Sequence, residues 1–131
     1  MERKIILNTS NSKIKKLANK VYRFFATIFP EITKKLIIVD FVDELQIKKI
    51  KKNFWKIGKT TDTITLIFED SVQIYLCLNI IKQNSIKLGN SFENEFCFVF
   101  LHSLLHSLGK NEEEVSQIQN YIFEKFLTCN F

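Results

Sequence analysis

The sequence predicts an α+β domain, in which a small mixed β-sheet of three to four strands is packed with about five helices. Short apolar runs of strand length alternate with longer segments of helical periodicity. The helical segments begin and end at capping residues. Of the 131 residues, 46% are apolar, which is enough for the core of one domain. We therefore expect residues 1–131 to form a single domain with the order β-α-β-α-β-β-α-α-α.

The first elements follow from short apolar runs and from one proline. Residues 4–8 are expected to form a strand, and Asn11 and Ser12 to cap a helix that runs to about residue 29. Pro30 ends this helix, because the residue before a proline is pushed out of the α region. Residues 35–41 contain Leu-Ile-Ile-Val, a run that suits a buried strand.

A second helix is expected to open at Asp43 and Glu44, where the helix dipole favours acidic side chains. Its apolar side chains should pack inward from one face, at Leu45, Ile47, Ile50 and Phe54. The lysines of the segment mostly take the opposite face, at Lys48, Lys49, Lys51 and Lys52.

Two further strands and a helix follow in the middle of the chain. Residues 63–68 and 72–76 are expected to form strands around a Glu-Asp-Ser turn. Residues 79–88 have the character of a helix, and Gly89 closes it.

The last two helices differ in their apolar pattern. The helix at 92–108 begins after Ser91, ends at Gly109 and is apolar almost all round, so we expect it to be the buried central helix. The final helix begins with three glutamates and has an inner stripe at Val115, Ile118, Ile122, Phe123 and Phe126.

The charge is divided unequally between the two parts of the chain. Residues 1–60 carry 15 Lys and Arg against 5 Asp and Glu, whereas residues 61–131 carry 4 against 9. A basic segment of this kind favours a polyanion such as RNA as partner. However, 17 of the 19 basic residues are lysine, and with abundant Ile, Asn and Phe this is also typical of codon use in an A/T-rich genome.

The chain is expected to be cytoplasmic and to have no membrane segment. The apolar run after the first four residues is too short for a signal peptide, and no run reaches the length of a membrane-spanning helix. The three cysteines, Cys77, Cys97 and Cys129, form no C-x-x-C pair. We therefore expect reduced thiols that serve in packing.

The chemistry of the chain centres on its two histidines, His102 and His106. A separation of four places both imidazoles on one face of the central helix, one turn apart, as two ligands of one metal ion require. No glutamate lies between them, which argues against a peptidase of the H-E-x-x-H class. The alternative is two histidines that form hydrogen bonds within a core helix.

A third ligand can come from the chain beyond Gly109, where the helix must stop. The candidates are Glu112, Glu113 and Glu114. Acidic residues in the first turn of a helix also have a simpler explanation, since each stabilises the helix by roughly 0.3–1 kcal/mol through the dipole.

At these residues the sequence resembles the YbeY family, whose signature is H-G-x-L-H-L-x-G-Y-D-H. The matching stretch is Leu-His-Ser-Leu-Leu-His-Ser-Leu-Gly at 101–109. Residues 61–66 resemble the family's T-D-V-L-S-F strand, 71–74 lie where it has an edge strand beginning G-D-I, and 87–95 resemble its L-G-H-S-x-E-x-E junction. These blocks occur in the family's order from about residue 33 to the end of the chain.

The resemblance implies a zincin-like fold and a single-strand-specific, metal-dependent endoribonuclease that acts in rRNA maturation and ribosome quality control. Its partners would be rRNA and the small ribosomal subunit. By position, His102 and His106 are the first two ligands of one divalent metal, with zinc as the expected ion. The family's third histidine falls at Glu112, its Gly after the first histidine at Ser103, and its basic Arg at Trp55.

Three lysines are expected to hold the RNA backbone: Lys52, Lys56 and Lys59. Lys56 lies beside Trp55 and is the candidate to replace the family's arginine in catalysis, although a lysine offers only a point charge. Because Glu112 and Trp55 change the chemistry, a second hypothesis is a non-catalytic ribosome- or rRNA-binding protein. A third is a small metallohydrolase that acts on another substrate.

Overall fold

The computed structural model of the chain describes residues 4–55 and 61–129, and for Trp55 only the backbone. Its four strands form one mixed sheet in the order β1-β2-β4-β3. The parallel pairs are β1 with β2 and β2 with β4, whereas β3 is antiparallel to β4 and lies at the edge of the sheet. The strands are β1 (Ile5–Asn8), β2 (Leu36–Phe41), β3 (Thr63–Ile67) and β4 (Ser71–Leu76).

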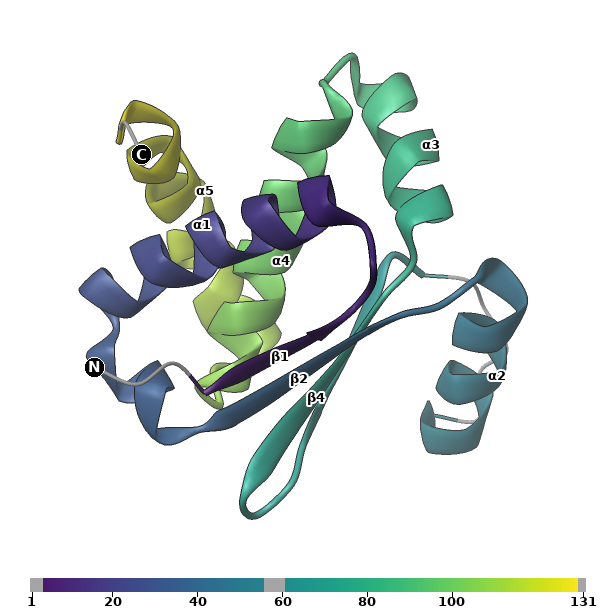
Figure 1. Cartoon of the computed structure of the whole chain (residues 1–131), viewed down its shortest axis with the longest axis horizontal. Helices are drawn as coiled ribbons and strands as arrows, with labels where there is room; N and C mark the ends of the chain where they lie inside the picture. Colours follow the sequence, from purple (N-terminus) through teal and green to yellow (C-terminus); the bar gives the residue numbers. More distant parts are fainter. Residues whose placement is uncertain (1–3, 56–60, 130–131) are drawn as a thin grey trace.

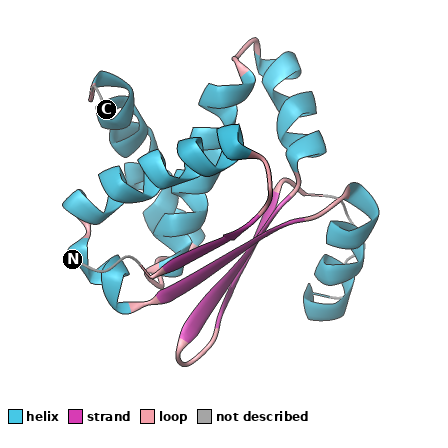
Figure 2. Ribbon diagram, in the orientation of Figure 1, coloured by secondary structure: helices cyan, strands magenta, loops and turns pink. Residues whose placement is uncertain are grey.

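Five α-helices accompany this sheet, as expected for an α+β domain (Figures 1 and 2). Where the sequence predicted the start or end of a helix, the observed bound lies within two residues of it; the ends of α2 and α5 were not predicted. They are α1 (Ser12–Ile28), α2 (Glu44–Trp55), α3 (Leu78–Leu88), α4 (Phe92–Ser107) and α5 (Glu112–Thr128).

Side-chain caps explain where three of the helices begin. The side chain of Asn11 accepts a hydrogen bond from the backbone of Ile14 at the start of α1, and Ser91 accepts one at the start of α4. Asp43 and Gln46 cap α2 through reciprocal bonds of 2.8 and 3.0 Å between side chain and backbone. Such caps satisfy backbone N–H groups that have no partner within the helix.

A short 3₁₀ helix, Pro30–Lys34, follows α1 and was not predicted. The sequence indicated only that α1 ends at Pro30. The extra turn buries Ile32 completely, so the apolar contact of this one side chain holds the connection between α1 and β2 against the core.

The central helix is α4, as predicted. Ten of its 16 residues are buried, and it packs against α1, α3, α5 and β3. In Figure 1, α1, α4 and α5 lie on the same side of the sheet. Their side chains form one core with the inward face of the strands, which includes Ile37, Val39 and Ile74.

Helix α2 lies on the other side of the sheet and is much less buried. A small second cluster consists of Ile47, Ile64 and Cys77. The prediction that Leu45 and Phe54 also pack inward was wrong, since they are 63% and 56% exposed. Only a narrow stripe of α2 reaches the sheet, so a periodic apolar position does not guarantee burial.

The cysteine prediction was right for two residues of three. Cys77 and Cys97 are buried, but Cys129 is exposed, because the chain has left the core at the end of α5. Among the helices that the structure describes, none is both long and apolar enough to cross a bilayer.

Candidate metal centre

The imidazoles of His102 and His106 project from one face of α4 and meet at their Nε2 atoms, which are 3.1 Å apart. The side chains are 24% and 20% exposed. A separation of four residues on a helix brings the rings together, and the buried opposite face of α4 fixes the direction in which they point. The convergence expected from the spacing is therefore present.

The chain beyond α4 turns back towards these rings. Gly109 has a φ of +88°, a left-handed conformation that glycine adopts without steric cost. Two residues on, Asn111 and Glu114 form a capping box that begins α5. Glu112 is the first residue of α5, and this turn directs its side chain at the histidines.

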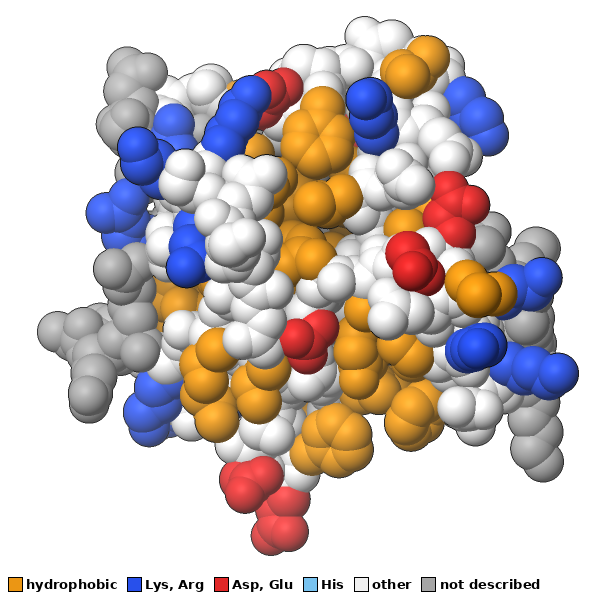
Figure 3. Space-filling model, turned by 45° about the vertical axis from the view of Figure 1, so that its right-hand side comes forward, with side chains coloured by type: hydrophobic (Ala, Val, Ile, Leu, Met, Phe, Trp, Pro, Cys, Tyr) orange, Lys and Arg blue, Asp and Glu red, His pale blue; other side chains and the backbone are white. Residues whose placement is uncertain are grey.

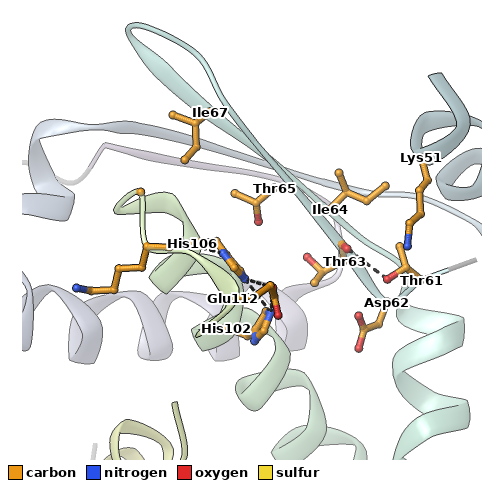
Figure 4. Close-up of a pocket in the computed structure, with 12 residues that line it drawn as sticks. Lys51, Thr61, Asp62, Thr63, Ile64, Thr65, Ile67, His102, His106 and Glu112 are labelled. Carbon is orange, nitrogen blue, oxygen red and sulfur yellow. Dashed lines mark hydrogen bonds and ion pairs between the residues drawn. The ribbon is translucent and has the colours of Figure 1, made fainter. Parts of the chain in front are cut away.

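Glu112 completes a group of three ligand atoms (Figure 4). Its Oε1 lies 2.5 Å from Nε2 of His106 and 3.6 Å from Nε2 of His102. The ligand atoms of the three side chains all lie within 4.8 Å of one another. Neither of the neighbouring glutamates belongs to this group, and the carboxylate of Glu114 is engaged in the capping box.

The Nδ1 atoms of both histidines, which face away from the triad, are also held by hydrogen bonds. Nδ1 of His106 lies 3.0 Å from the carbonyl oxygen of Lys110, and Nδ1 of His102 lies 2.7 Å from Oε1 of Gln119 on α5. An Nδ1–H that donates to an oxygen leaves the lone pair of Nε2 directed into the site. Metal-binding histidines are held by outer hydrogen bonds of this kind.

The donor set fits a divalent metal ion. Two imidazole nitrogens and one carboxylate oxygen are a known ligand set of catalytic zinc, which leaves a fourth position open. Three converging acceptor atoms repel one another unless a cation or protons lie between them. The triad is therefore a possible metal-binding site on geometry and on chemistry.

The triad borders a cavity of about 590 Å³. The facing wall is β3 and the segment before it, from which Thr61, Thr63, Thr65 and Ile67 line the cavity (Figure 4). These alternate residues share one face of the strand. Lys51 of α2 lines another side of the cavity. The cavity is therefore bordered by α2, by β3 with the segment before it, and by α4 with the start of α5.

A hydrogen bond fixes β3 to the helix that carries the histidines. The hydroxyls of Thr63 and Ser103 are 2.7 Å apart. Ser103 donates its proton to the carbonyl of Val99, so Thr63 is the donor between the two side chains. The resemblance described above aligns Ser103 with the glycine of the family signature and Thr63 with a valine. The two departures thus form a contact with each other.

Asp62 lies between this cavity and a smaller one of about 190 Å³. Burial raises the pKa of its carboxyl above the ordinary value. Nearby His102 and Lys51 act against this shift to a lesser degree. Asp62 thus gives the cavity a polar side. The sequence alone did not single this residue out as functional.

The structure brings together His102, His106 and Glu112, but it treats the predicted lysines differently. Lys52 is exposed on α2 and is not one of the residues that line the cavity. Lys56 and Lys59 lie outside the described residues. Lys51 lines the cavity instead and was missed. No signal in the sequence distinguishes Lys51 from the other lysines of α2.

Comparison with known proteins agrees with this architecture. The family model described as endoribonuclease YbeY matches residues 2–125. The chain belongs to the YbeY family. The solution structure of TM1509 from Thermotoga maritima has the same fold, with a TM-score of 0.67 and 24% identity over 95% of this chain and 89% of that one.

Curated YbeY proteins match over shorter segments. The endoribonuclease YbeY of Thermosipho melanesiensis is 32% identical over 97 residues, which are 66% of this chain and 70% of that protein. The endoribonuclease YbeY of Ureaplasma urealyticum is 34% identical over 84 residues, which are 59% of this chain and 54% of that protein. The matched segment thus spans little more than half of the second relative. Family membership supports the zincin-like architecture that the YbeY resemblance implied.

Proposed function

We propose that this chain is a cytoplasmic, metal-dependent endoribonuclease that cleaves single-stranded RNA in rRNA maturation and ribosome quality control, with rRNA of the small subunit as its substrate. The observation that carries this proposal is the convergence of His102, His106 and Glu112 beside an open cavity. The relatives named endoribonuclease YbeY supply the reaction class.

The proposed metal is one zinc ion per chain, held by Nε2 of both histidines and by the Glu112 carboxylate. When bound, such an ion polarises a phosphoryl oxygen and lowers the pKa of water. A carboxylate ligand adds negative charge where the family has a neutral imidazole, so it should weaken both effects. Glu112 therefore predicts a slower enzyme than one with three histidines.

The chain's own residues would hold the substrate. Lys51 brings a positive charge to the cavity, and the hydroxyls of Thr61 and Thr65 line the opposite wall. These groups suit phosphate oxygens and sugar hydroxyls. The exposed lysines of α2 extend the positive surface beyond the cavity. We propose that Lys52 holds the RNA backbone on this surface and that Lys56 and Lys59, which lie outside the described residues, also bind the backbone, with Lys56 as the candidate for a catalytic cation.

The direct test uses the purified chain after chelation and after reloading with zinc or manganese. We expect the loaded protein to cleave a single-stranded RNA and to spare the same sequence in a duplex. His102→Ala and His106→Ala should lose both bound metal and cleavage. Activity that persists in the chelated protein, or in both variants, would contradict the proposal.

A second candidate function is RNA binding without cleavage. It is favoured by the replacement of the family's third histidine by Glu112 and of its arginine by Trp55. Retardation of RNA on a native gel with no product, in protein that carries stoichiometric metal or none, would support this candidate over the first.

A further inference from the structure

A second, smaller cavity adjoins the metal centre. Its volume is about 190 Å³, and three of its lining residues, Asp62, Thr63 and His102, also line the cavity of about 590 Å³. The two cavities therefore meet at these three side chains. A nucleotide whose phosphate lies in the larger cavity, beside the triad, can thus place its base in the smaller one.

The apolar part of the smaller cavity consists of Phe98 and Val99 on α4. Val99 is buried, whereas Phe98 is half-buried. The ring of Phe98 is held edge-to-face against Phe123 of α5, with the two centroids 5.2 Å apart. An aromatic ring that is fixed in this way offers a surface against which a planar base can pack.

Two carboxylates line the same cavity and can accept further hydrogen bonds. Glu95 of α4 is one of them, although it is only 6% exposed. Among the described residues its one recorded partner is Asn90, whose Nδ2 lies 3.4 Å from Oε1, so Oε2 has none. Asp62 is the other, and Figure 4 shows its carboxylate turned away from Lys51. A buried carboxylate with an unused oxygen requires a donor.

The cavity also contains one side-chain amide, that of Gln119 on α5. Its Oε1 lies 2.7 Å from Nδ1 of His102. Within residues 4–55 and 61–129, its Nε2 has no recorded partner, so this nitrogen can donate to a ligand. The cavity thus combines two carboxylate acceptors with one amide donor. Such a set repels phosphate and suits a base edge that has several N–H groups and one oxygen.

The four RNA bases differ in what they present to these groups. The Watson–Crick edge of guanine has the acceptor O6 beside two donors, N1–H and the N2 amino group. Adenine and cytosine have one donor on this edge, an amino group, and beside it a ring nitrogen that accepts. Uracil has one N–H between two carbonyl oxygens, which carboxylates repel. Guanine is therefore the base whose edge matches two carboxylates and one amide donor.

We propose that the smaller cavity is a base-binding subsite that prefers guanine. Gln119 donates to O6, and the carboxylates of Asp62 and Glu95 accept from N1–H and the N2 amino group, while the base packs on Phe98. The sugar and phosphate of this guanosine continue into the larger cavity, so cleavage occurs next to a guanosine. This inference rests on the proposed function for RNA as the substrate and names the nucleotide that is bound beside the triad.

The test measures binding and needs no cleavage. The full chain, after chelation, is titrated with the 5′-monophosphates of guanosine, inosine, adenosine, cytidine and uridine, and NMR follows the backbone amides of Phe98 and Gln119. We expect guanosine monophosphate to bind about tenfold more tightly than the adenosine, cytidine and uridine nucleotides, which is the scale of one good contact to a base edge.

Inosine differs from guanosine only by the missing N2 amino group, so it tests the carboxylate contacts without any change of the protein. Its monophosphate should lose most of the advantage of guanosine monophosphate. Equal binding of these two nucleotides would overturn the proposal. Shifts that leave the amides of Phe98 and Gln119 unperturbed would overturn it as well, because the nucleotide would then bind elsewhere.

Asp62→Asn and Glu95→Gln keep the shape of each side chain but replace an acceptor-only carboxylate by an amide. Each should remove most of the preference for guanosine monophosphate and leave the binding of uridine monophosphate unchanged. The matched control is Asp70→Asn in the turn between β3 and β4, where the side chain is exposed. This control should keep the full preference. A preference that survives in both Asp62→Asn and Glu95→Gln would contradict the subsite.

The same measurements separate the subsite from the proposed function. Preferential binding of guanosine monophosphate by a chain that cleaves no RNA with zinc or manganese would support the subsite and contradict the nuclease. Equal binding of all five nucleotides by an active nuclease, which also cleaves strands with and without guanosine equally well, would contradict the subsite alone.

Discussion

Two walls of the same cavity are built in contrasting ways. One wall carries His102 and His106 and belongs to α4, which is buried along most of its length and is joined to β3 and α5 by side-chain hydrogen bonds. The other wall carries Lys51 and belongs to α2, in which Ile47 is the one fully buried side chain among those that the structure describes. The fold thus places two of the three possible metal ligands on its most constrained element and a cavity-lining cation on a loosely packed one.

This difference in packing suits the two functions that we propose, which are metal binding at α4 and RNA binding at α2. Metal ligands must be held within a fraction of an ångström, and the packing of α4 supplies that restraint. A lysine that meets a flexible RNA strand acts as a point charge and tolerates movement. Figure 3 shows one face of the molecule, on which Lys and Arg side chains lie among apolar, acidic and neutral ones.

The largest expected effect concerns the constrained wall. Glu112→Ala should reduce bound zinc from about one per chain to almost none, because two histidines alone hold a divalent ion weakly. Glu112→His should keep the metal and raise cleavage at neutral pH, since a neutral ligand lets bound water titrate nearer ~7. Metal analysis after gel filtration, with single-turnover cleavage assays, measures both.

The control for this change is Glu113→Ala, which removes a charge from the same helix turn outside the triad. It should keep its metal and lose only about 0.3–1 kcal/mol of helix stability. If Glu112→Ala also keeps its metal, Glu112 is merely a charge at the helix end.

A smaller effect is expected on the loosely packed wall. Lys51→Ala should weaken binding of single-stranded RNA and lower the slope of log affinity against log salt by about 0.7. Bound metal should not change, because α2 contributes no ligand to the triad. Fluorescence anisotropy at several salt concentrations tests this.

Lys87→Ala is the matched control for Lys51, since Lys87 is exposed at the end of α3. Lys52→Ala shows whether the outer lysines of α2 contribute as well. An equal loss in all three variants would mean that Lys51 acts only through net charge.

The hydrogen bond between Thr63 of β3 and Ser103 of α4 can be measured on its own. Thr63→Val and Ser103→Ala should each destabilise the chain by about 1 kcal/mol, because each leaves a polar partner unsatisfied. The double variant should cost less than the sum of the two. Urea unfolding of the four proteins gives the coupling, and strictly additive losses would show that the 2.7 Å contact contributes nothing.

The smallest effect is a difference in thiol reactivity between the two sides of the sheet. Cys97 lies on α4, and burial raises the pKa of its thiol to about 12. Cys77 lies in the small cluster beneath α2. At pH 8 and low denaturant, Cys129 should react at once, Cys77 after local opening, and Cys97 last. Mass spectrometry of alkylated peptides gives the order.

The pH dependence of this experiment has a definite sign. The folded Cys97 keeps its proton up to about pH 12, whereas an unfolded thiol loses it near 9.0. Its ionisation therefore favours the unfolded state as pH rises above about 9. Reaction of Cys97 before Cys77 would mean that α4 is not the more stable side.

The sequence predicted the strands, the α-helices and the histidine pair, but not the 3₁₀ helix Pro30–Lys34. Helix ends followed from Asn11, Ser91 and Gly89, and the i, i+4 spacing of the histidines required their convergence. Leu45 and Phe54 were misassigned because periodicity shows that a helix has an apolar face but not how much of it finds a partner.

Contacts between segments that lie far apart in the chain could not be predicted from the sequence. The order of the sheet, the bond from Thr63 to Ser103, and the contact of Gln119 with His102 all depend on tertiary packing. Lys51 could not be distinguished from its neighbouring lysines, because only the docking angle of α2 decides which of them reaches the cavity. The family resemblance predicted Glu112 as a ligand from its position in the signature. The turn at Gly109 and the capping box of α5 explain why its side chain points at the histidines.

That capping box also has an evolutionary consequence. Asn111 and Glu114 begin α5, whereas the intervening Glu112 takes no part in the cap. The residue at 112 can therefore be exchanged without loss of the helix start, while the backbone continues to direct its side chain at the two histidines. Ligand identity and folding are separable at this position. A substitution at this one position can thus change the donor atoms beside the two histidines in a protein that still folds.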